Sequence, residues 1–351
     1  MLNLALIGYG GMGKYHANTL ITPEPNVKII GVFDIDDTAT TQAKSDGYDV
    51  YDCFSDVLTD ANVDAVLIVT PNDTHRDIAI AALKAGKHVL CEKPVMMNTG
   101  ELQEVLEVAM ETGNIFYVHQ NRRWDEDFLI IKNLYENKQI GDLFRIESRV
   151  HGANGIPGDW RHLKAHGGGM VLDWGVHIID QLYYLIDSPL KSVSADLSFV
   201  LGDECDDGFT AIIKWQNGVE ALIEVGTTNF VKLPRWYVKG LEGTALIADW
   251  DMSGEMVVRG GSSNTSNTHS NLTPIQAGVG LTKTMAPPSE DDITRLELPK
   301  PAYQPESIYE NFYRVITEDA KPIVKNQQVY EVLSLIEDIF EAAETQTVIK
   351  Y

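Results

Sequence analysis

The first 120 residues alternate short apolar runs with segments in which apolar side chains recur at helical spacing. The runs are rich in Val, Ile and Leu on both faces, which is typical of strands buried on both sides of a sheet. Strands that alternate with helices in this way indicate an α/β, doubly wound parallel sheet of the Rossmann type. We expect strands at residues 4–7, 28–33, 65–70, 88–91 and 115–118, and helices at 13–20, 77–85 and 100–112.

The pattern changes near residue 121, where a polar segment interrupts the alternation. Beyond it, strand-like runs follow one another with short turns such as residues 216–218, Gln-Asn-Gly, which is typical of hairpins. This half is therefore expected to be α+β, with a large and mostly antiparallel sheet. We expect strands at residues 143–151, 191–201, 208–215, 219–225, 235–239, 245–249 and 256–259, and helices at 128–137, 169–186, 306–317 and 326–344.

The chain length of 351 residues favours two domains over one. We place one domain at residues 1–120 and a second at 121–351, with the last helix packing back on the first domain. Residues 260–302 are rich in Gly, Ser, Asn and Pro, and residues 261–271 form a low-complexity run. Polar loops of this length are usually functional or disordered, so we expect a long excursion from the second sheet.

Acidic residues dominate the charge: 51 Asp and Glu against 28 Lys and Arg give a formal net charge of −23. Such a surface repels nucleic acids and anionic membranes, and neither is expected as a partner. The three cysteines, Cys53, Cys91 and Cys205, are widely spaced and lack a CxxC pattern, so neither a disulfide framework nor a metal site is expected. The chain shows no signal-peptide pattern and no apolar run that could span a bilayer, which favours the cytoplasm.

A glycine motif follows the first expected strand, because residues 8–13, GYGGMG, match GxGxxG. In this pattern Gly8 permits a tight turn, Gly10 lets the backbone approach a pyrophosphate, and Gly13 lets the next helix pack on the strand. Asp34 ends the second strand, where it would accept hydrogen bonds from a ribose 2′-OH and repel a 2′-phosphate. The motif therefore predicts a dinucleotide site that prefers NAD to NADP, with an ordinary glycine-rich turn as the alternative.

Two further segments carry candidate chemistry. Residues 88–94 end a strand in Glu-Lys-Pro, and ligands of open α/β sheets bind at the carboxyl ends of strands, so Lys93 would project towards the cofactor. Residues 167–180 begin with three glycines, which mark a close backbone approach, and continue as a helix. Asp173 and His177 are four residues apart on that helix and share one face. A surface lysine and a solvated polar face are the alternative interpretations.

The chain resembles the glucose–fructose oxidoreductase/inositol dehydrogenase (Gfo/Idh/MocA) family over nearly its whole length. The resemblance rests on four motifs in order: GYGGMG at 8–13, TPNDTH at 70–75, EKP at 92–94 and GGGMVLDWGVHIID at 167–180. It implies that Lys93, Asp173 and His177 form the catalytic set of an NAD-dependent dehydrogenase acting on CH–OH groups.

The resemblance also implies a role for each catalytic residue. A substrate hydroxyl carbon gives a hydride to the nicotinamide while His177 takes the hydroxyl proton as general base. Lys93 stabilises charge on the substrate oxygen, and Asp173 contacts another hydroxyl or orients the site. Further cofactor contacts are implied along the glycine turn, the 70–75 loop and the end of the fourth strand; by position these are Tyr9, Gly11, Met12, Thr70, Pro71, Asn72, His75 and Glu92.

Two clusters of aromatic and basic residues, at 121–124 and 155–162, indicate a sugar pocket. Trp160 would supply an aromatic face, and Arg161 and Arg122 would supply hydrogen-bond donors. Alternatively, Trp124 packs under the domain junction and the arginines pair with the many carboxylates. We assign NAD binding to residues 1–120 and substrate binding and oligomerisation to residues 121–351.

Three functions fit these residues. The favoured hypothesis is a sugar, glycoside or polyol dehydrogenase, which would form NADH in step with product. An NAD-retaining redox glycosidase would release an aglycone without net NADH. A non-catalytic dinucleotide-binding regulator would tend to lose the lysine or histidine, which this chain keeps. The broad sheet face, together with the resemblance, implies a homodimer or homotetramer.

Overall fold

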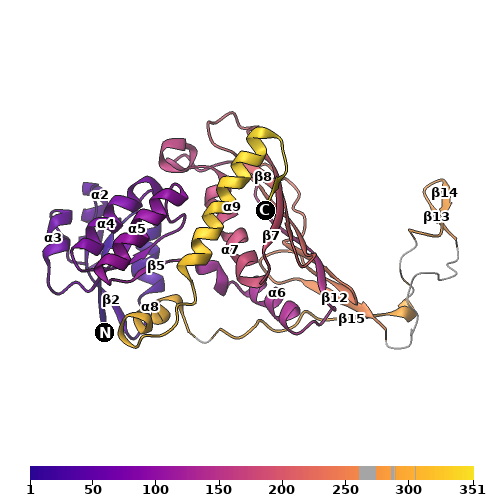
Figure 1. Cartoon of the computed structure of the whole chain (residues 1–351), viewed down its shortest axis with the longest axis horizontal. Helices are drawn as coiled ribbons and strands as arrows, with labels where there is room; N and C mark the ends of the chain where they lie inside the picture. The colour runs from indigo at the N-terminus through magenta and orange to yellow at the C-terminus, as the bar shows by residue number, and fades with distance from the viewer. Residues whose placement is uncertain (261–273, 286–287, 289, 305) are drawn as a thin grey trace.

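The computed structural model of the chain describes residues 1–260, 274–285, 288, 290–304 and 306–351. Its N-terminal half contains a five-stranded parallel sheet in the order β2-β1-β3-β4-β5, which confirms the expected Rossmann-type sheet (Figure 1). The order reverses between β1 and β3, and ligands of such sheets bind at the carboxyl ends of the strands beside this reversal. The strands are β1 (Leu2–Ile7), β2 (Val27–Phe33), β3 (Ala65–Ile68), β4 (His88–Cys91) and β5 (Phe116–Val118).

The helices of this half differ in part from the expectation. α4 (His75–Lys84) and α5 (Thr99–Thr112) match two of the expected helices. α2 (Asp37–Ser45) and α3 (Phe54–Thr59) are not predicted, because short polar helices carry little apolar periodicity. The segment after the glycine motif is not one helix over 13–20 but α1 (Gly11–Tyr15) followed by the π-helical turn η1 (His16–Leu20).

The second half contains a nine-stranded sheet in the order β15-β12-β11-β10-β6-β9-β8-β7-β16. Every pairing is antiparallel except that of β6 with β9, which confirms the mostly antiparallel sheet. The strands are β6 (Leu143–His151), β7 (Leu190–Ser198), β8 (Gly208–Trp215), β9 (Glu220–Gly226), β10 (Trp236–Gly240), β11 (Gly243–Ile247), β12 (Gly254–Arg259), β15 (Ile293–Leu296) and β16 (Ile349–Lys350).

The helices of the second half include α6 (Glu126–Glu136) and α7 (Val176–Leu185). The expected helix over 169–186 begins instead as a π-helical turn, η6 (Val171–Gly175), which leads into α7. Such turns are rare and are often found at functional sites. The short 3-10 segments are η2 (Asn72–Thr74), η3 (Asn121–Trp124), η4 (Trp160–His162), η5 (Lys164–His166) and η7 (Glu290–Asp292).

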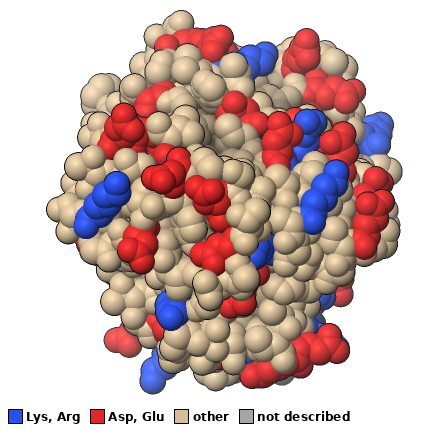
Figure 2. All heavy atoms as spheres, turned by 90° about the vertical axis from the view of Figure 1, so that its left-hand side faces the viewer, with Lys and Arg blue, Asp and Glu red and all other residues tan. Residues whose placement is uncertain are grey.

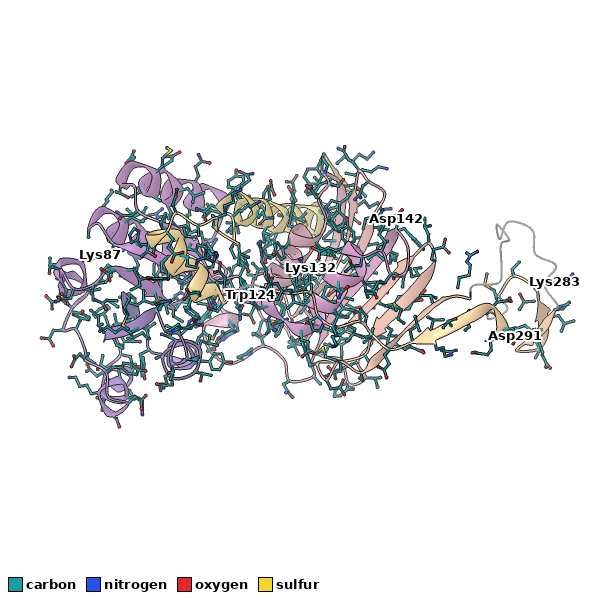
Figure 3. The ribbon with its side chains drawn as sticks, turned by 90° about the horizontal axis from the view of Figure 1, so that it is seen from below. Lys87, Trp124, Lys132, Asp142, Lys283 and Asp291 are labelled. Carbon is teal, nitrogen blue, oxygen red and sulfur yellow. The ribbon has the colours of Figure 1, made fainter. Side chains whose placement is uncertain are left out.

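Two hydrophobic clusters form the core, one under each sheet. α8 (Ile308–Thr317) packs its buried side chains into the first cluster, although it follows the second sheet in the chain. α9 (Asn326–Thr345) joins both clusters, with Leu333 in the first and Ile339 in the second. The last helix therefore packs back on the N-terminal half as expected. Trp124 lies between the two halves and donates from Nε1 to the Glu306 carbonyl at 2.8 Å (Figure 3).

The excursion expected at 260–302 is described only in part, because residues 261–273, which include the low-complexity run, and residues 286–287 and 289 lie outside the described residues. β13 (Ile275–Ala277) and β14 (Gly280–Thr282) form a ribbon carried away from the sheet (Figure 1). Acidic side chains are spread over the face of the N-terminal half that Figure 2 shows, with basic ones between them. None of the described helices is long and apolar enough to cross a membrane.

Candidate functional site

A cavity of about 740 Å³ lies where the topology predicts it, at the carboxyl ends of β1, β3 and β4. Its N-terminal wall contains the glycine turn and the loops after β2 and β3. Residues of the second half, from Asp159 to His166, close it from the other side. Ten of the residues expected at the cofactor line it: Gly8, Gly10, Gly11, Met12, Asp34, Thr70, Pro71, Asn72, Glu92 and Lys93.

The glycine turn has the backbone that a dinucleotide requires. Gly8 has φ of +97°, and a Cβ there would lie 2.6 Å from the Val69 carbonyl oxygen. A Cβ on Gly13 would lie 2.1 Å from the Gly8 carbonyl oxygen, so the turn closes only with glycine at both positions. By contrast, a Cβ on Gly10 or Gly11 meets no atom of the described residues within 4 Å. Gly10 and Gly11 therefore face open space in the cavity, at the start of α1, where a pyrophosphate fits.

Asp34 lies at the end of β2 with its carboxylate fixed by the backbone. Oδ2 accepts a hydrogen bond from the Tyr9 amide at 2.6 Å, and Oδ1 accepts one from the Asp36 amide at 2.9 Å. The carboxylate lines the cavity and keeps acceptor capacity for a ribose hydroxyl. The Asp34 carboxylate, as an acceptor for the ribose, and the open glycine turn together fit a dinucleotide.

Three residues expected at the cofactor, Tyr9, Gly13 and His75, do not line the cavity. The side chain of Tyr9 is buried and its hydroxyl donates to Asp46 Oδ2 at 2.7 Å, so only the Tyr9 backbone belongs to the turn. His75 is fully buried, and its ring bonds the carbonyls of Thr70 and Pro94 at 2.9 and 3.1 Å. His75 thus holds the two loops that line the cavity, because its ring nitrogens are already used within the protein.

Lys93 lines the cavity and meets Asp173 beside it, although the two residues are 80 positions apart in the chain. Neither Asp173 nor His177 lines the cavity itself. Lys93 Nζ lies 3.1 Å from Asp173 Oδ1 and 3.1 Å from its backbone carbonyl. Arg161 Nε lies 3.6 Å from the same carboxylate oxygen. Burial acts to raise the pKa of Asp173, but the two cations outweigh it and the pKa is lowered. Asp173 is therefore an anion that orients the Lys93 ammonium.

His177 lies one turn beyond Asp173, at the start of α7, and is 5% exposed. Burial, Lys93 and Arg122 hold its pKa well below the ordinary value, so the ring is neutral. Its Nδ1 has no hydrogen-bond partner among the described residues. A neutral, buried and unsatisfied imidazole beside an ammonium group can accept a proton from a ligand hydroxyl.

The polar face of α7 is not solvated, which removes the alternative interpretation of this helix. Asp180 is buried and receives two hydrogen bonds from Arg123, at 2.6 and 2.7 Å. Gln181 is buried and donates to the Arg122 carbonyl at 2.7 Å. The face therefore packs against η3, the segment that joins the two halves.

The three glycines before η6 are required by close approaches, as the sequence predicts. A Cβ on Gly168 would lie 2.2 Å from the Arg161 carbonyl oxygen, and one on Gly169 would lie 2.2 Å from Asp206 Oδ1. Asp206, which the sequence pattern does not single out, accepts from the Met170 and Val171 amides at 2.9 Å each. Burial raises the pKa of Asp206 to about 6. Asp206 thus fixes the start of the turn that carries Asp173.

Comparisons with known proteins identify the family of this chain. Residues 2–120 match the profile described as an oxidoreductase family with an NAD-binding Rossmann fold, and residues 128–246 match the GFO/IDH/MocA C-terminal domain. A solved NAD-binding protein from Listeria innocua is 58% identical, with a TM-score of 0.96 over 100% of this chain and 99% of that one. The chain belongs to the GFO/IDH/MocA oxidoreductase family.

Curated relatives of this family member are more distant. An uncharacterized oxidoreductase of Schizosaccharomyces pombe is 29% identical over 85% of this chain and 84% of its own length. The scyllo-inositol 2-dehydrogenase (NAD(+)) of Bacillus subtilis is 33% identical over 54% of this chain and 55% of its own length.

The three residues expected at the substrate take two different places in this oxidoreductase. Trp160 and Arg161 line the cavity, and the Arg161 guanidinium stacks 4.6 Å from the Trp160 ring. Arg122 does not line it. Its guanidinium lies 4.2 Å from the Trp174 ring and its Nη1 lies 2.8 Å from Asp125 Oδ2. Arg122 and Arg161 both pair with carboxylates, as the alternative interpretation expects, yet both remain beside the Asp173–His177 turn.

An aromatic cluster beside His177 is not singled out by the sequence pattern. Trp174 contacts the His177 ring edge-on at 5.8 Å between centroids, and Trp250 lies 6.1 Å from Trp174. Trp250 comes from the turn after β11 and is 39% exposed. The Arg122 guanidinium lies within reach of both rings. Neither tryptophan has a sequence signal, because the turn after β11 meets η6 only through the tertiary fold.

Proposed function

We propose that the chain is an NAD-dependent dehydrogenase that oxidises a CH–OH group of a sugar, glycoside or polyol. The observation that carries this proposal is the group that adjoins the cavity at Lys93. Lys93 Nζ is held 3.1 Å from Asp173 Oδ1, and a buried, neutral His177 follows one turn later with Nδ1 unpaired. Bound NAD supplies the acceptor for a hydride. The name of the Bacillus subtilis relative supports a polyol substrate.

Each residue has one task in this proposal. His177 takes the proton of the substrate hydroxyl, because a neutral imidazole has a free lone pair. Lys93 donates a hydrogen bond to the same oxygen and stabilises the charge that develops there. Asp173 holds the ammonium in place. Trp160 and Arg161 close the cavity over the cofactor, and Arg122 and Trp174 face the substrate beyond His177.

NAD is the proposed cofactor rather than NADP. Asp34 lines the cavity, and Asp36 and Asp37 follow it in the chain, so the segment after β2 offers negative charge where a 2′-phosphate would need cations. A phosphate on the ribose would meet these charges at the rim of the cavity. Equilibrium titration with both dinucleotides tests this choice, and tighter binding of NADP would contradict it.

We further propose a cytoplasmic homodimer or homotetramer. β9 alternates buried and partly exposed residues, which leaves one face of the nine-stranded sheet available to another copy. Light scattering behind size-exclusion chromatography tests the oligomeric state, and a monomer at micromolar concentration would contradict this proposal.

A substrate panel tests the reaction. Inositols, aldoses, anhydrosugars and aryl glucosides are incubated with protein and NAD, and NADH and free aglycone are measured together. The dehydrogenase forms NADH in step with oxidised product. Aglycone release without net NADH would show a redox glycosidase instead, and dinucleotide binding without either product would favour a regulator.

A further inference from the structure

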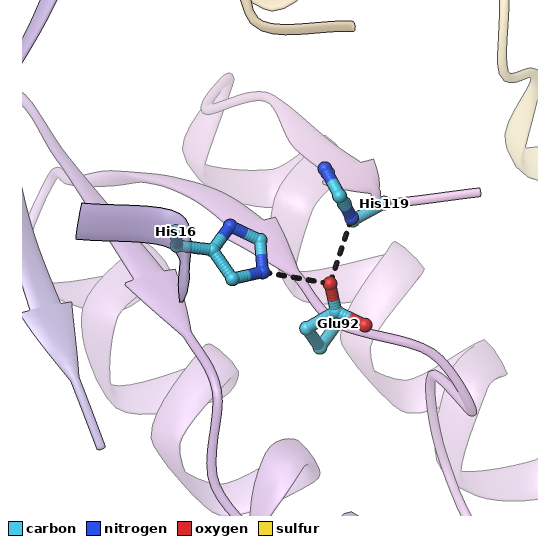
Figure 4. Close-up of side chains that lie close together, drawn as sticks. All are labelled: His16, Glu92 and His119. Atoms are coloured by element: carbon cyan, nitrogen blue, oxygen red, sulfur yellow. Dashed lines mark hydrogen bonds and ion pairs between the residues drawn. The ribbon is translucent and has the colours of Figure 1, made fainter. Parts of the chain in front are cut away.

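A buried polar cluster lies directly behind the cavity, outside the Lys93–Asp173–His177 group. It contains His16, Glu92 and His119, which Figure 4 shows, and Tyr309; their side chains are 0%, 5%, 1% and 3% exposed. These residues come from η1, the end of β4, the end of β5 and α8. Four segments that are far apart in the chain thus converge on one carboxylate.

Hydrogen-bond distances fix the arrangement around Glu92. Its Oε1 lies 2.9 Å from His16 Nε2 and 2.7 Å from His119 Nδ1. Its Oε2 accepts from the Lys93 backbone amide at 3.0 Å. The Tyr309 hydroxyl lies 2.5 Å from His16 Nδ1. Glu92 therefore faces a donor at both oxygens and also lines the cavity.

The proton positions follow from the chemistry of the groups. Burial acts against ionisation of Glu92, but the two histidines outweigh it and hold the pKa of Glu92 well below its ordinary value. Burial also lowers the pKa of His16, so its ring is neutral. A neutral ring carries one N–H, which His16 must direct from Nε2 to the carboxylate, and its Nδ1 then accepts from the Tyr309 hydroxyl.

His16, Glu92 and His119 could also serve as ligands of a metal ion, yet the distances favour direct contacts of the two rings with the carboxylate. Both histidine nitrogens approach the same oxygen of Glu92 at 2.7 and 2.9 Å. Ligands about 2 Å from a zinc ion at tetrahedral angles would instead stand about 3.3 Å from one another. The cluster is therefore built to hold an anion.

We infer that His16, His119 and Tyr309 hold Glu92 as a buried anion that stabilises the oxidised form of the bound cofactor over the reduced form. This inference rests on the proposed function, in which the nicotinamide lies beside Lys93. The nicotinamide ring carries a positive charge only when it is oxidised, and a carboxylate in a site of low dielectric attracts it strongly. The Lys93 ammonium offsets only part of this charge, because it is paired with Asp173.

Dissociation constants for NAD⁺ and NADH, measured separately by titration calorimetry and NADH fluorescence, test the inference. Glu92→Gln keeps the shape and removes the charge, so we expect it to weaken NAD⁺ relative to NADH by about tenfold, which for a two-electron couple corresponds to about 30 mV. Glu337→Gln is the matched control: it removes a partly buried carboxylate that bonds Thr99 and does not line the cavity, and it should leave the ratio unchanged.

Variants of His16, His119 and Tyr309, which position Glu92, provide a second test. The double variant His16→Asn/His119→Asn should move the ratio in the same direction as Glu92→Gln, and Tyr309→Phe should do so by about twofold. A merely structural role would weaken both forms equally, so an unchanged ratio in Glu92→Gln overturns the inference. A stoichiometric metal in the purified protein that the double variant loses would also overturn it. If the unmodified protein binds neither form, the proposed function fails as well, whereas parallel losses in both constants refute this inference alone.

Discussion

The two walls of the cavity are built in different ways. The N-terminal wall is largely backbone: Gly10 and Gly11 present open main chain, and Asp34 is fixed by the backbone amides of Tyr9 and Asp36. The opposite wall and the group that adjoins the cavity are side chains brought together from distant segments, such as Lys93 with Asp173. A backbone site depends on local sequence, whereas a side-chain site depends on how the two halves pack. Substitutions in the two walls should therefore change different properties of the protein.

The largest effect is expected on the side-chain wall. His177→Ala removes the proposed base and should lower kcat by about a thousandfold, within the range for general acid–base groups, while the Kd for NAD changes little. Steady-state kinetics and equilibrium NAD titration measure the two quantities. Near-normal turnover in a folded His177→Ala protein would refute the base role. A large loss of NAD affinity would show that the two walls are not separable.

Two glycines of one motif should separate folding from binding. Gly13→Ala places a methyl group 2.1 Å from the Gly8 carbonyl oxygen and should cost about 1–3 kcal/mol of unfolding free energy. Gly10→Ala meets no described protein atom and should leave stability unchanged while it weakens NAD. Chemical denaturation and NAD titration measure both variants. Equal stability of the two would contradict the close packing at Gly13.

Asp34 sharpens the contrast within the N-terminal wall. Asp34→Ala removes a charged acceptor for the ribose hydroxyls and should weaken NAD by about tenfold, with a smaller loss for NADP. kcat at saturating NAD should change little, because the side chain is remote from the Lys93–Asp173 pair. Competition between the two dinucleotides measures the preference, and an unmodified protein that already prefers NADP would contradict this role.

The smallest effect concerns the pH dependence set by the side-chain wall. His177 must be neutral to accept a proton. Because its pKa is lowered, the ring stays neutral at pH values at which an ordinary histidine would already be protonated. Activity is then lost as the pH falls through that pKa. Arg122→Met removes one of the charges that lower it, so the acid limb of kcat/KM should move to higher pH. Arg161→Met, which acts on Asp173, is the matched variant and should leave this limb in place.

The fold was predictable from local pattern to the extent that the pattern was strong. The strands of the first sheet, seven of the nine strands of the second sheet, and the long helices α4, α5 and α9 follow from apolar periodicity. The short edge strands β15 and β16 are not predicted. The π-helical turns η1 and η6 were missed, because a single inserted residue barely alters that periodicity. Both turns carry polar residues of the site, His16 and Asp173. Local irregularity at functional positions is where pattern alone fails.

In the candidate site, too, the local pattern predicted some features and missed others. His75 was expected at the cofactor, but burial turned its ring towards the carbonyls of two loops. Tyr9 likewise contributes its amide rather than its side chain. The motif fixes which backbone segment lies at the cavity, but the direction of each side chain depends on what packs against it.

The parallel sheet, the glycine turn and Asp34 could be predicted from periodicity and from the spacing of the glycine motif. The set Lys93, Asp173 and His177 followed from the family resemblance of the motifs that contain these residues. Other contacts are visible only in the tertiary structure. Lys93 meets Asp173, and Asp206 fixes the start of η6. His16, His119 and Tyr309 surround Glu92. Such contacts join segments tens to hundreds of residues apart, and their energies depend on burial, which no local pattern contains.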